Sequence, residues 1–171
     1  TVDFGLTRGM ESAPVRYAEL ARALGIEAGE RAAAEDVRRE VLRLRAGKGM
    51  VLDPEDPDTW STGSFFTNPV VSEEEAAHLP PEAPRYPVAE PGMVKLSAAW
   101  LIDRSGFPKG FGLPEAGQGA ELAGGRASLS TKHTLAVTSR GNATAEDLLA
   151  VARAVADGGY EAFGLRLHPE P

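Results

Sequence analysis

The sequence contains no cysteine among its 171 residues. That absence excludes disulfide bonds, thiolate-held iron–sulfur clusters, zinc ribbons and thiol nucleophiles. The three histidines, His78, His133 and His168, do not stand at the spacing of metal ligands, so we expect no metal site. Positive charge is also scarce, because 18 Lys and Arg face 25 Asp and Glu. The net charge of −7 argues against a general nucleic-acid binder or a basic membrane-surface module.

Long hydrophobic runs are missing as well. No apolar run approaches the ~20 residues that a membrane span needs, and the first residues lack the charged-then-apolar pattern of a secretion signal. Hydrophobic residues nevertheless make up 42% of the chain, which is enough to bury a core. We therefore expect a globular protein of the cytoplasm that has neither a nucleic-acid nor a membrane partner.

Hydrophobic periodicity predicts a helix over residues 35–45. Val37, Val41 and Leu44 fall on one face of this segment. Gly47 suits the end of the helix, because glycine is common just past a helix C-terminus.

Three further helices are expected behind capping residues. Ser72 starts a capping box with three glutamates, Ser97 precedes an apolar segment, and Thr144 begins the last strong helix. The Gly158-Gly159 pair weakens this last helix, so we expect an interruption there.

Strands are expected over residues 1–6, 129–138 and 165–167, with Lys132 and His133 on the second of them. These strands and the helices alternate without the β-α-β rhythm that a parallel sheet requires. The sequence therefore predicts an α+β fold.

Residues 63–69 (GSFFTNP) place a serine directly after a glycine, between a polar loop and an apolar segment. A turn followed by a buried phenylalanine pair explains this pattern. The alternative uses the Ser64 hydroxyl as a proton donor to a reacting carbon, with Asn68 as a fixed hydrogen-bonding group. No general base stands nearby in the sequence, so a nucleophilic serine triad is not supported.

Arg45 and Lys48 stand at the C-terminal end of the first predicted helix. Compensation of the helix dipole is the ordinary role of such cations. A diphosphate clamp is the alternative, since an arginine donates a fork of hydrogen bonds and a lysine supplies a point charge. Lys109, in a glycine-flanked loop, and the Lys132-His133 pair could join this clamp.

Two further observations concern the chemistry. The sequence contains neither a Walker-type phosphate loop nor the glycine motif of a dinucleotide-binding fold. Glu170 stands between two prolines after an apolar segment, where a solvated glutamate is the ordinary interpretation.

Short stretches in a fixed order carry a resemblance to a known family. They are residues 15–20 (VRYAEL), 45–48 (RAGK), 63–71 (GSFFTNPVV), 94–102 (VKLSAAWLI), 106–110 (GFPKG), 130–133 (STKH), 142–144 (NAT), 163–164 (FG) and 167–170 (LHPE). Over essentially the whole chain they resemble the C-terminal substrate-binding portion of the UDP-N-acetylenolpyruvoylglucosamine reductase (MurB) family. The resemblance implies a mixed or antiparallel sheet with packed helices.

The same resemblance implies UDP-N-acetylmuramate dehydrogenase activity, a cytoplasmic step of peptidoglycan synthesis. In this step the enolpyruvyl ether of UDP-N-acetylglucosamine is reduced, and the family uses FAD and NADPH as cofactors. By match to the family, Ser64 is the proton donor. Glu170 assists by stabilising or protonating the enolic intermediate.

Substrate contacts are also implied by the resemblance. Tyr17 matches the tyrosine of a mobile loop that covers the substrate. Lys48, Asn68 and Lys109 match residues near the diphosphate and the nucleotide-sugar, and Arg45 and His133 are weaker matches.

The family's domain organisation implies a boundary within this chain. Residues 1–34 are assigned to the edge of a flavin domain and the substrate-covering loop, and residues 35–171 to the substrate-binding domain. The FAD-binding domain itself, with its catalytic arginine, is expected to precede residue 1, so we expect this chain alone to be inactive. Two alternatives remain open: a stand-alone nucleotide-sugar binding module without redox activity, and a structural module whose site has decayed.

Overall fold

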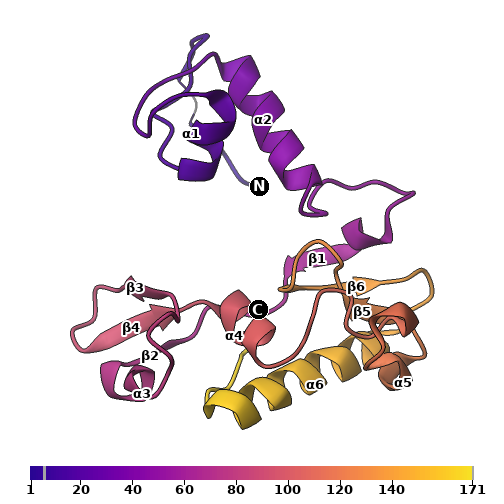
Figure 1. The fold of residues 1–171 in the computed structure, drawn as a ribbon. Helices are drawn as coiled ribbons and strands as arrows, with labels where there is room; N and C mark the ends of the chain where they lie inside the picture. Colours follow the sequence, from indigo (N-terminus) through magenta and orange to yellow (C-terminus); the bar gives the residue numbers. More distant parts are fainter. Residues whose placement is uncertain (6, 171) are drawn as a thin grey trace. The chain divides into compact units, whose positions relative to one another are not determined.

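The computed structural model describes residues 1–5 and 7–170 (Figure 1). Its contacts divide the chain into two compact units, Thr1–Val51 and Leu52–Pro171. This division differs from the expected boundary between residues 34 and 35, because the helix that begins at Ala34 packs against the helix before it. The assignment of the first 34 residues to the edge of a flavin domain stays a prediction.

The N-terminal unit holds two helices, α1 (Ala18–Leu24) and α2 (Ala34–Ala46), which pack against each other. α2 confirms the helix predicted from the periodicity of the sequence. The segment before α1 is tied to the start of α2 by the N–H of Ala34, which donates to the carbonyl of Met10 at 2.8 Å. Residues 1–5 form no strand, so the expected N-terminal strand is wrong for these residues, and Leu6 lies outside the described residues.

The C-terminal unit holds two antiparallel sheets and confirms the α+β fold. One sheet has the strand order β1-β6-β5 and the other the order β2-β4-β3. The elements are η1 (Pro57–Thr59), β1 (Ser61–Ser64), β2 (Val70–Ser72), α3 (Glu73–Ala77), β3 (Arg85–Pro87), β4 (Met93–Leu96), α4 (Ala98–Arg104), η2 (Pro114–Ala116), α5 (Ala120–Ala123), β5 (Ala127–Leu129), β6 (Ala136–Ser139) and α6 (Ala145–Phe163).

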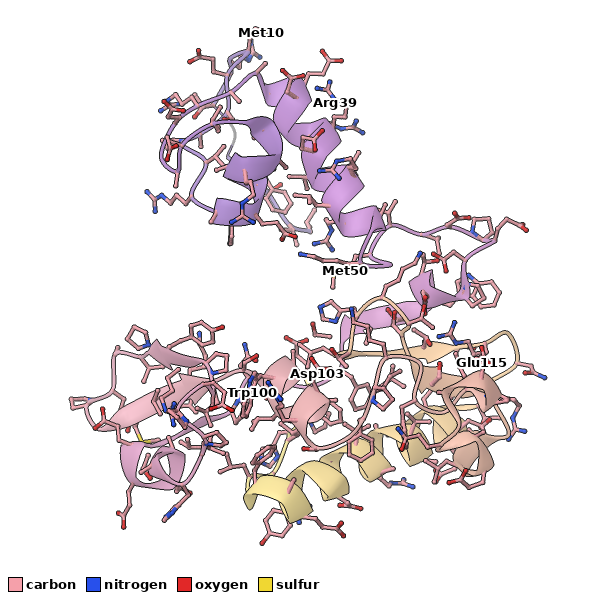
Figure 2. The ribbon with its side chains drawn as sticks, viewed as in Figure 1. Met10, Arg39, Met50, Trp100, Asp103 and Glu115 are labelled. Carbon is pink, nitrogen blue, oxygen red and sulfur yellow. The ribbon has the colours of Figure 1, made fainter. Side chains whose placement is uncertain are left out.

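The long helix α6 contributes several residues to the core of the C-terminal unit. It packs against β5, β6, α4 and α5, and its Val151 and Val155 are fully buried with Leu129 of β5. Figure 1 shows α6 running along the unit, with the two sheets apart from each other. At its C-terminal end the ring of Phe163 lies 5.8 Å from that of Trp100 on α4, a residue labelled in Figure 2.

The expected interruption of the last helix is wrong, because α6 continues through both glycines. A Cβ atom at Gly158 would lie 2.4 Å from the ring of Phe107, so the glycine allows a close approach of that ring to the helix. The burial of Phe107 against α6 offsets the helix propensity lost at a glycine, which is about 1 kcal/mol.

The capping residues behave as expected. Ser72 and Thr144 each accept a hydrogen bond from the third residue of the following helix and complete a capping box. The Ser97 hydroxyl accepts from the N–H of Trp100 at the start of α4. Local hydrogen bonds of this kind depend on sequence neighbours alone, which is why they are readable from sequence.

Two strand expectations need correction. The predicted strand over residues 129–138 is two strands, β5 and β6, joined by a turn over residues 130–135, and Lys132 and His133 lie in this turn and not on a strand. The turn forms because the buried Ser130 hydroxyl accepts the N–H groups of both residues. The segment expected as a strand at residues 165–167 forms no strand, but the residues just after it pair with the chain near Phe66.

Candidate active site

Ser64 lies at the end of β1, where this strand leaves its pairing with β6. Ser64 is opposite Ala136, and the N–H of Phe65 donates to the carbonyl of Leu135 at 2.7 Å. The pairing register shifts between Ser61 and Ser64, where Gly63 has a φ of +94°. A glycine tolerates this φ without steric cost, so the irregularity re-aims the end of the strand. The serine is half-buried.

Glu170 lies beside this strand end although it is remote in sequence. Its N–H donates to the carbonyl of Phe65 at 2.8 Å, and Phe66 and Pro169 form an antiparallel bridge. The N–H of Thr67 donates to the carbonyl of His168 at 3.0 Å, across 101 positions of sequence. The structure therefore brings the backbones of Ser64 and Glu170 together and leaves the glutamate side chain exposed.

His133 lies in the β5–β6 turn beside the same strand end. Its carbonyl accepts the N–H of Ala136, the residue opposite Ser64, at 3.1 Å. Its ring Nδ1 accepts the N–H of Leu135 at 3.1 Å. An Nδ1 that accepts a hydrogen bond carries no proton, so this contact fixes the orientation of the ring in the turn.

Lys109 stands in a loop that is fastened to the β5–β6 turn. The next residue, Gly110, donates its N–H to the carbonyl of Ser130 at 3.2 Å and has a φ of +80°. A Cβ at this glycine would lie 3.5 Å from the methyl group of Thr131, so the loop and the turn are in direct contact. Lys109 is exposed, which leaves its ammonium group accessible to an anion.

The buried carboxylate of Asp58 is hydrogen-bonded to the β5–β6 turn, and the sequence did not predict this contact. Asp58 accepts hydrogen bonds from both the N–H and the hydroxyl of Thr131, and from the guanidinium of Arg140 at 2.8 Å. Burial raises the pKa of the Asp58 carboxyl, but the hydrogen bonds from Thr131 and the charge of Arg140 outweigh burial and lower it below its usual value. The only sequence signal is an aspartate after the proline of an Asp-Pro-Asp turn, which by itself indicates a helix start.

A second ion pair holds the turn at its edge. The ammonium of Lys132 pairs with the carboxylate of Asp56, and this hydrogen bond raises the pKa of Lys132. Lys132 is therefore committed to a protein partner, whereas the sequence analysis grouped it with the possible diphosphate ligands.

Asn68 stands between the two sheets. Its Oδ1 accepts a hydrogen bond of 2.9 Å from the N–H of Ala98 at the start of α4. This bond fixes the orientation of the amide, so the NH2 group is the part that can donate to a ligand. Asn68 also lines a cavity of about 390 Å³ at the edge of β2. The other lining residues are Thr67, Pro69, Val70, Val71, Glu75, Tyr160, Gly164, Leu165, Arg166 and His168.

Three predicted substrate contacts lie in the N-terminal unit. Tyr17 is the N-cap residue of α1 and is strongly exposed, with 79% of its surface accessible. Arg45 lies in the last turn of α2, where its charge compensates the helix dipole. Lys48 forms an ion pair of 2.6 Å with Glu19 of α1, so its ammonium already has a carboxylate partner within this unit.

The structure thus gathers Ser64, Glu170, Lys109 and His133 on segments that are hydrogen-bonded to one another, and Asn68 lies in the segment between β1 and β2. Among the described residues, no group of three or more His, Asp or Glu side chains could hold a metal ion. Within the same residues no helix is long and apolar enough to cross a membrane.

Comparison with known proteins agrees with this α+β arrangement. Residues 53–171 match the family model of the UDP-N-acetylenolpyruvoylglucosamine reductase C-terminal domain. The protein of that name from Streptomyces coelicolor is 56% identical to this chain over 170 residues. The one from Mycobacterium tuberculosis is 51% identical to this chain over 178 residues. These alignments cover 94% and 99% of this chain but 41% and 46% of the two relatives. The reductase from Saccharopolyspora erythraea is 53% identical over 180 residues, with 99% and 46% coverage.

The fold defines an α+β domain, and the relatives that share its sequence are named as reductases. The chain belongs to the UDP-N-acetylenolpyruvoylglucosamine reductase family and matches the C-terminal domain of that family. It spans less than half the length of the curated relatives named above.

Proposed function

We propose that this chain supplies the substrate-binding portion and the proton donor of a UDP-N-acetylmuramate dehydrogenase. The substrate is enolpyruvyl-UDP-N-acetylglucosamine, and the product serves peptidoglycan synthesis in the cytoplasm. The observation that carries the proposal is the pairing of the Glu170 segment with the strand end that bears Ser64. Two residues remote in sequence and expected to act on the same enolpyruvyl group are held together by backbone hydrogen bonds.

Reduction of the enolpyruvyl double bond needs a hydride at one carbon and a proton at the other. A flavin reduced by NADPH supplies the hydride. The Ser64 hydroxyl donates the proton to the neighbouring carbon, and Glu170 stabilises or protonates the enolic intermediate. A half-buried serine at a strand end suits this role, because the pairing of β1 with β6 fixes the position of its backbone.

FAD and NADPH would be held mainly outside these residues. The sequence contains no phosphate-binding loop of either common type, so no residue of this chain is assigned to the phosphates of either cofactor. The longer relatives have room for a flavin-binding domain before the matched region. We propose that this domain is the partner of the present chain and that the chain alone is inactive.

Donors from three segments of the C-terminal unit would bind the diphosphate of the substrate. Lys109 would supply a charge from its loop, His133 its imidazole from the adjoining turn, and Asn68 its amide NH2 group. From the N-terminal unit, Lys48 and Arg45 would add positive charge. Tyr17 would cover the bound sugar, which its exposure on α1 permits.

A stand-alone nucleotide-sugar binding module is the second candidate. It shares the binding residues with the first proposal but gives Ser64 no chemical role. The ordered site around Lys109 and His133 is compatible with both candidates, so catalysis must be tested directly.

The direct test is rapid kinetics on a full-length protein that carries this chain. Ser64→Ala should leave flavin reduction by NADPH nearly intact and slow flavin reoxidation by substrate ~10²-fold or more, the scale of a lost general acid. Ser61→Ala, on the same strand, is the matched control and should reoxidise at the normal rate. Unchanged reoxidation in Ser64→Ala would remove Ser64 from the mechanism and favour the binding module.

A further inference from the structure

We propose that Asp58 is a positioning residue that holds the β5–β6 turn and the Lys109 loop in the geometry that binds the substrate. Asp58 does not touch the substrate in this proposal. Asp58 holds Thr131 in place, and Thr131 in turn sets the positions of His133 and Lys109. This inference rests on the proposed function, because it assumes that these two side chains bind the nucleotide-sugar.

The carboxylate of Asp58 is almost completely enclosed. Its side chain is 5% exposed and that of its partner Arg140 is 14% exposed. One oxygen accepts the Thr131 N–H at 2.9 Å and the Arg140 guanidinium at 2.8 Å, and the other accepts the Thr131 hydroxyl. A buried charge persists only where such partners compensate for lost hydration, so the turn cannot move from Asp58 without a large cost.

Arg140 is anchored in turn to the adjoining sheet. Its Nε donates to the hydroxyl of Ser128 on β5 at 2.8 Å, and Ser128 is fully buried. The carboxylate is therefore fixed to the strand framework on one side and to the turn on the other. A hydrogen-bond network that joins a strand to a turn fixes the position of the turn as well as stabilising it.

The turn transmits this position to both proposed substrate ligands. Ser130 receives the N–H groups of Lys132 and His133 on its hydroxyl, and its carbonyl receives the N–H of Gly110. The Thr131 methyl group lies close to Gly110, because a Cβ added at this glycine would be 3.5 Å from it. A shift of Thr131 would therefore displace the imidazole of His133 and the loop that carries Lys109 together.

The lowered pKa of Asp58 is consistent with a carboxylate held by these hydrogen bonds and by Arg140. The hydrogen bonds from Thr131 and the charge of Arg140 keep the carboxylate ionised despite its burial. The pKa of Lys132 is raised mainly by its hydrogen bond to Asp56, and the charge of Asp58 contributes to the same shift.

The test compares Asp58→Asn with a matched control in a full-length protein that carries this chain. Asp58→Asn keeps the shape of the side chain but loses the charge that pairs with Arg140. We expect the KM for the enolpyruvyl nucleotide-sugar to rise about tenfold with little change in kcat, the sign of lost ground-state binding geometry. Asp147→Asn removes another enclosed carboxylate, which pairs with Arg126 at 2.6 Å and caps α6. It should lower the melting temperature and leave KM unchanged.

A double-mutant cycle with His133→Ala separates positioning from general destabilisation. If Asp58 acts through the turn, Asp58→Asn should raise KM far less in the His133→Ala background than in the unmodified protein. Fully additive effects, or an unchanged KM in Asp58→Asn, would overturn the inference. Thr131→Val, which removes only the hydroxyl donor, gives a milder version of the same test if Asp58→Asn does not fold.

The single variants distinguish this inference from the proposed function. If His133→Ala and Lys109→Ala both leave KM unchanged, the proposed substrate site fails, and the positioning role fails with it. If these two variants raise KM but Asp58→Asn does not, the site stands and only the role of Asp58 is overturned.

Discussion

The backbone N–H of Glu170 donates a 2.8 Å hydrogen bond to the carbonyl of Phe65, the residue that directly follows Ser64. One hydrogen bond thereby ties the end of the chain to the strand end that bears the proposed proton donor. The antiparallel bridge between Phe66 and Pro169 extends this pairing. This relationship places both proposed catalytic residues at one location.

Glu170→Gln tests the proposed role of the carboxyl group directly. Glutamine keeps the size of the side chain and the backbone hydrogen bond to Phe65, but it cannot donate or carry an acidic proton. We expect flavin reoxidation by the enolpyruvyl substrate to slow about tenfold or more in a full-length protein, with normal reduction by NADPH. Glu161→Gln, an exposed glutamate of α6, is the control and should react normally. Equal rates in the two variants would remove Glu170 from the mechanism.

Lys48→Ala tests whether the N-terminal unit contributes charge to substrate binding. The variant should weaken nucleotide-sugar binding, with the larger effect at low salt, because exposed charges act over longer distances there. Arg39→Ala removes an exposed cation of α2, the helix that ends just before Lys48, and should leave binding unchanged; Arg39 is labelled in Figure 2. Glu19→Gln frees the Lys48 ammonium from its ion pair and should strengthen binding. Unaltered binding in Lys48→Ala would restrict Lys48 to its contact with Glu19.

The lowered pKa values of Asp147 and Asp58 predict that the C-terminal unit loses stability in acid. The hydrogen bond from Arg126, followed by those from Thr144, holds the pKa of Asp147 well below its usual value, and the pKa of Asp58 is also lowered. A carboxyl whose pKa is lower in the folded state stabilises the fold above its unfolded pKa, near 3.8. This stabilisation is lost as pH falls toward the folded pKa, because the unfolded chain then binds more protons.

The free energy of unfolding should therefore be constant above about pH 5 and fall steeply below about pH 4. Asp147→Asn should be less stable at neutral pH and show a shallower fall in acid. Denaturant titrations at several pH values measure both effects. Parallel pH profiles for the variant and the unmodified chain would contradict this account.

Gly158→Ala tests the close packing of Phe107 against α6. The new methyl group would meet the Phe107 ring at 2.4 Å, so the ring or the helix must move, at a cost of about 1–3 kcal/mol. Gly159→Ala is the matched control, since its nearest side-chain atom, on Leu167, is at an ordinary 3.5 Å. We expect a lower melting temperature for the first variant and an equal or higher one for the second, which gains helix propensity. Equal melting temperatures would contradict the packing argument.

Local features of the fold could be predicted from the sequence. Helix α2 follows from the periodicity of its apolar residues, and the starts of α3 and α6 follow from Ser72 and Thr144. Each of these signals acts between residues a few positions apart, so a single sequence contains it in full.

Tertiary features could not be predicted in this way. The Asp58–Thr131 hydrogen bond joins residues 73 positions apart, and nothing near Asp58 in the sequence marks its partner. The expected break at Gly158 failed for the same reason, because the ring that stabilises the helix there comes from another segment. The strand-like content of residues 129–138 concealed a turn that the buried Ser130 hydroxyl forms.

Calorimetric titration of this 171-residue chain with enolpyruvyl-UDP-N-acetylglucosamine, with UDP as the control ligand, tests the central claim most directly. We expect the nucleotide-sugar to bind more tightly than UDP, and we expect Lys109→Ala and His133→Ala each to weaken its binding. Binding no tighter than that of UDP, in a folded sample, would contradict the claim that this chain builds the substrate site.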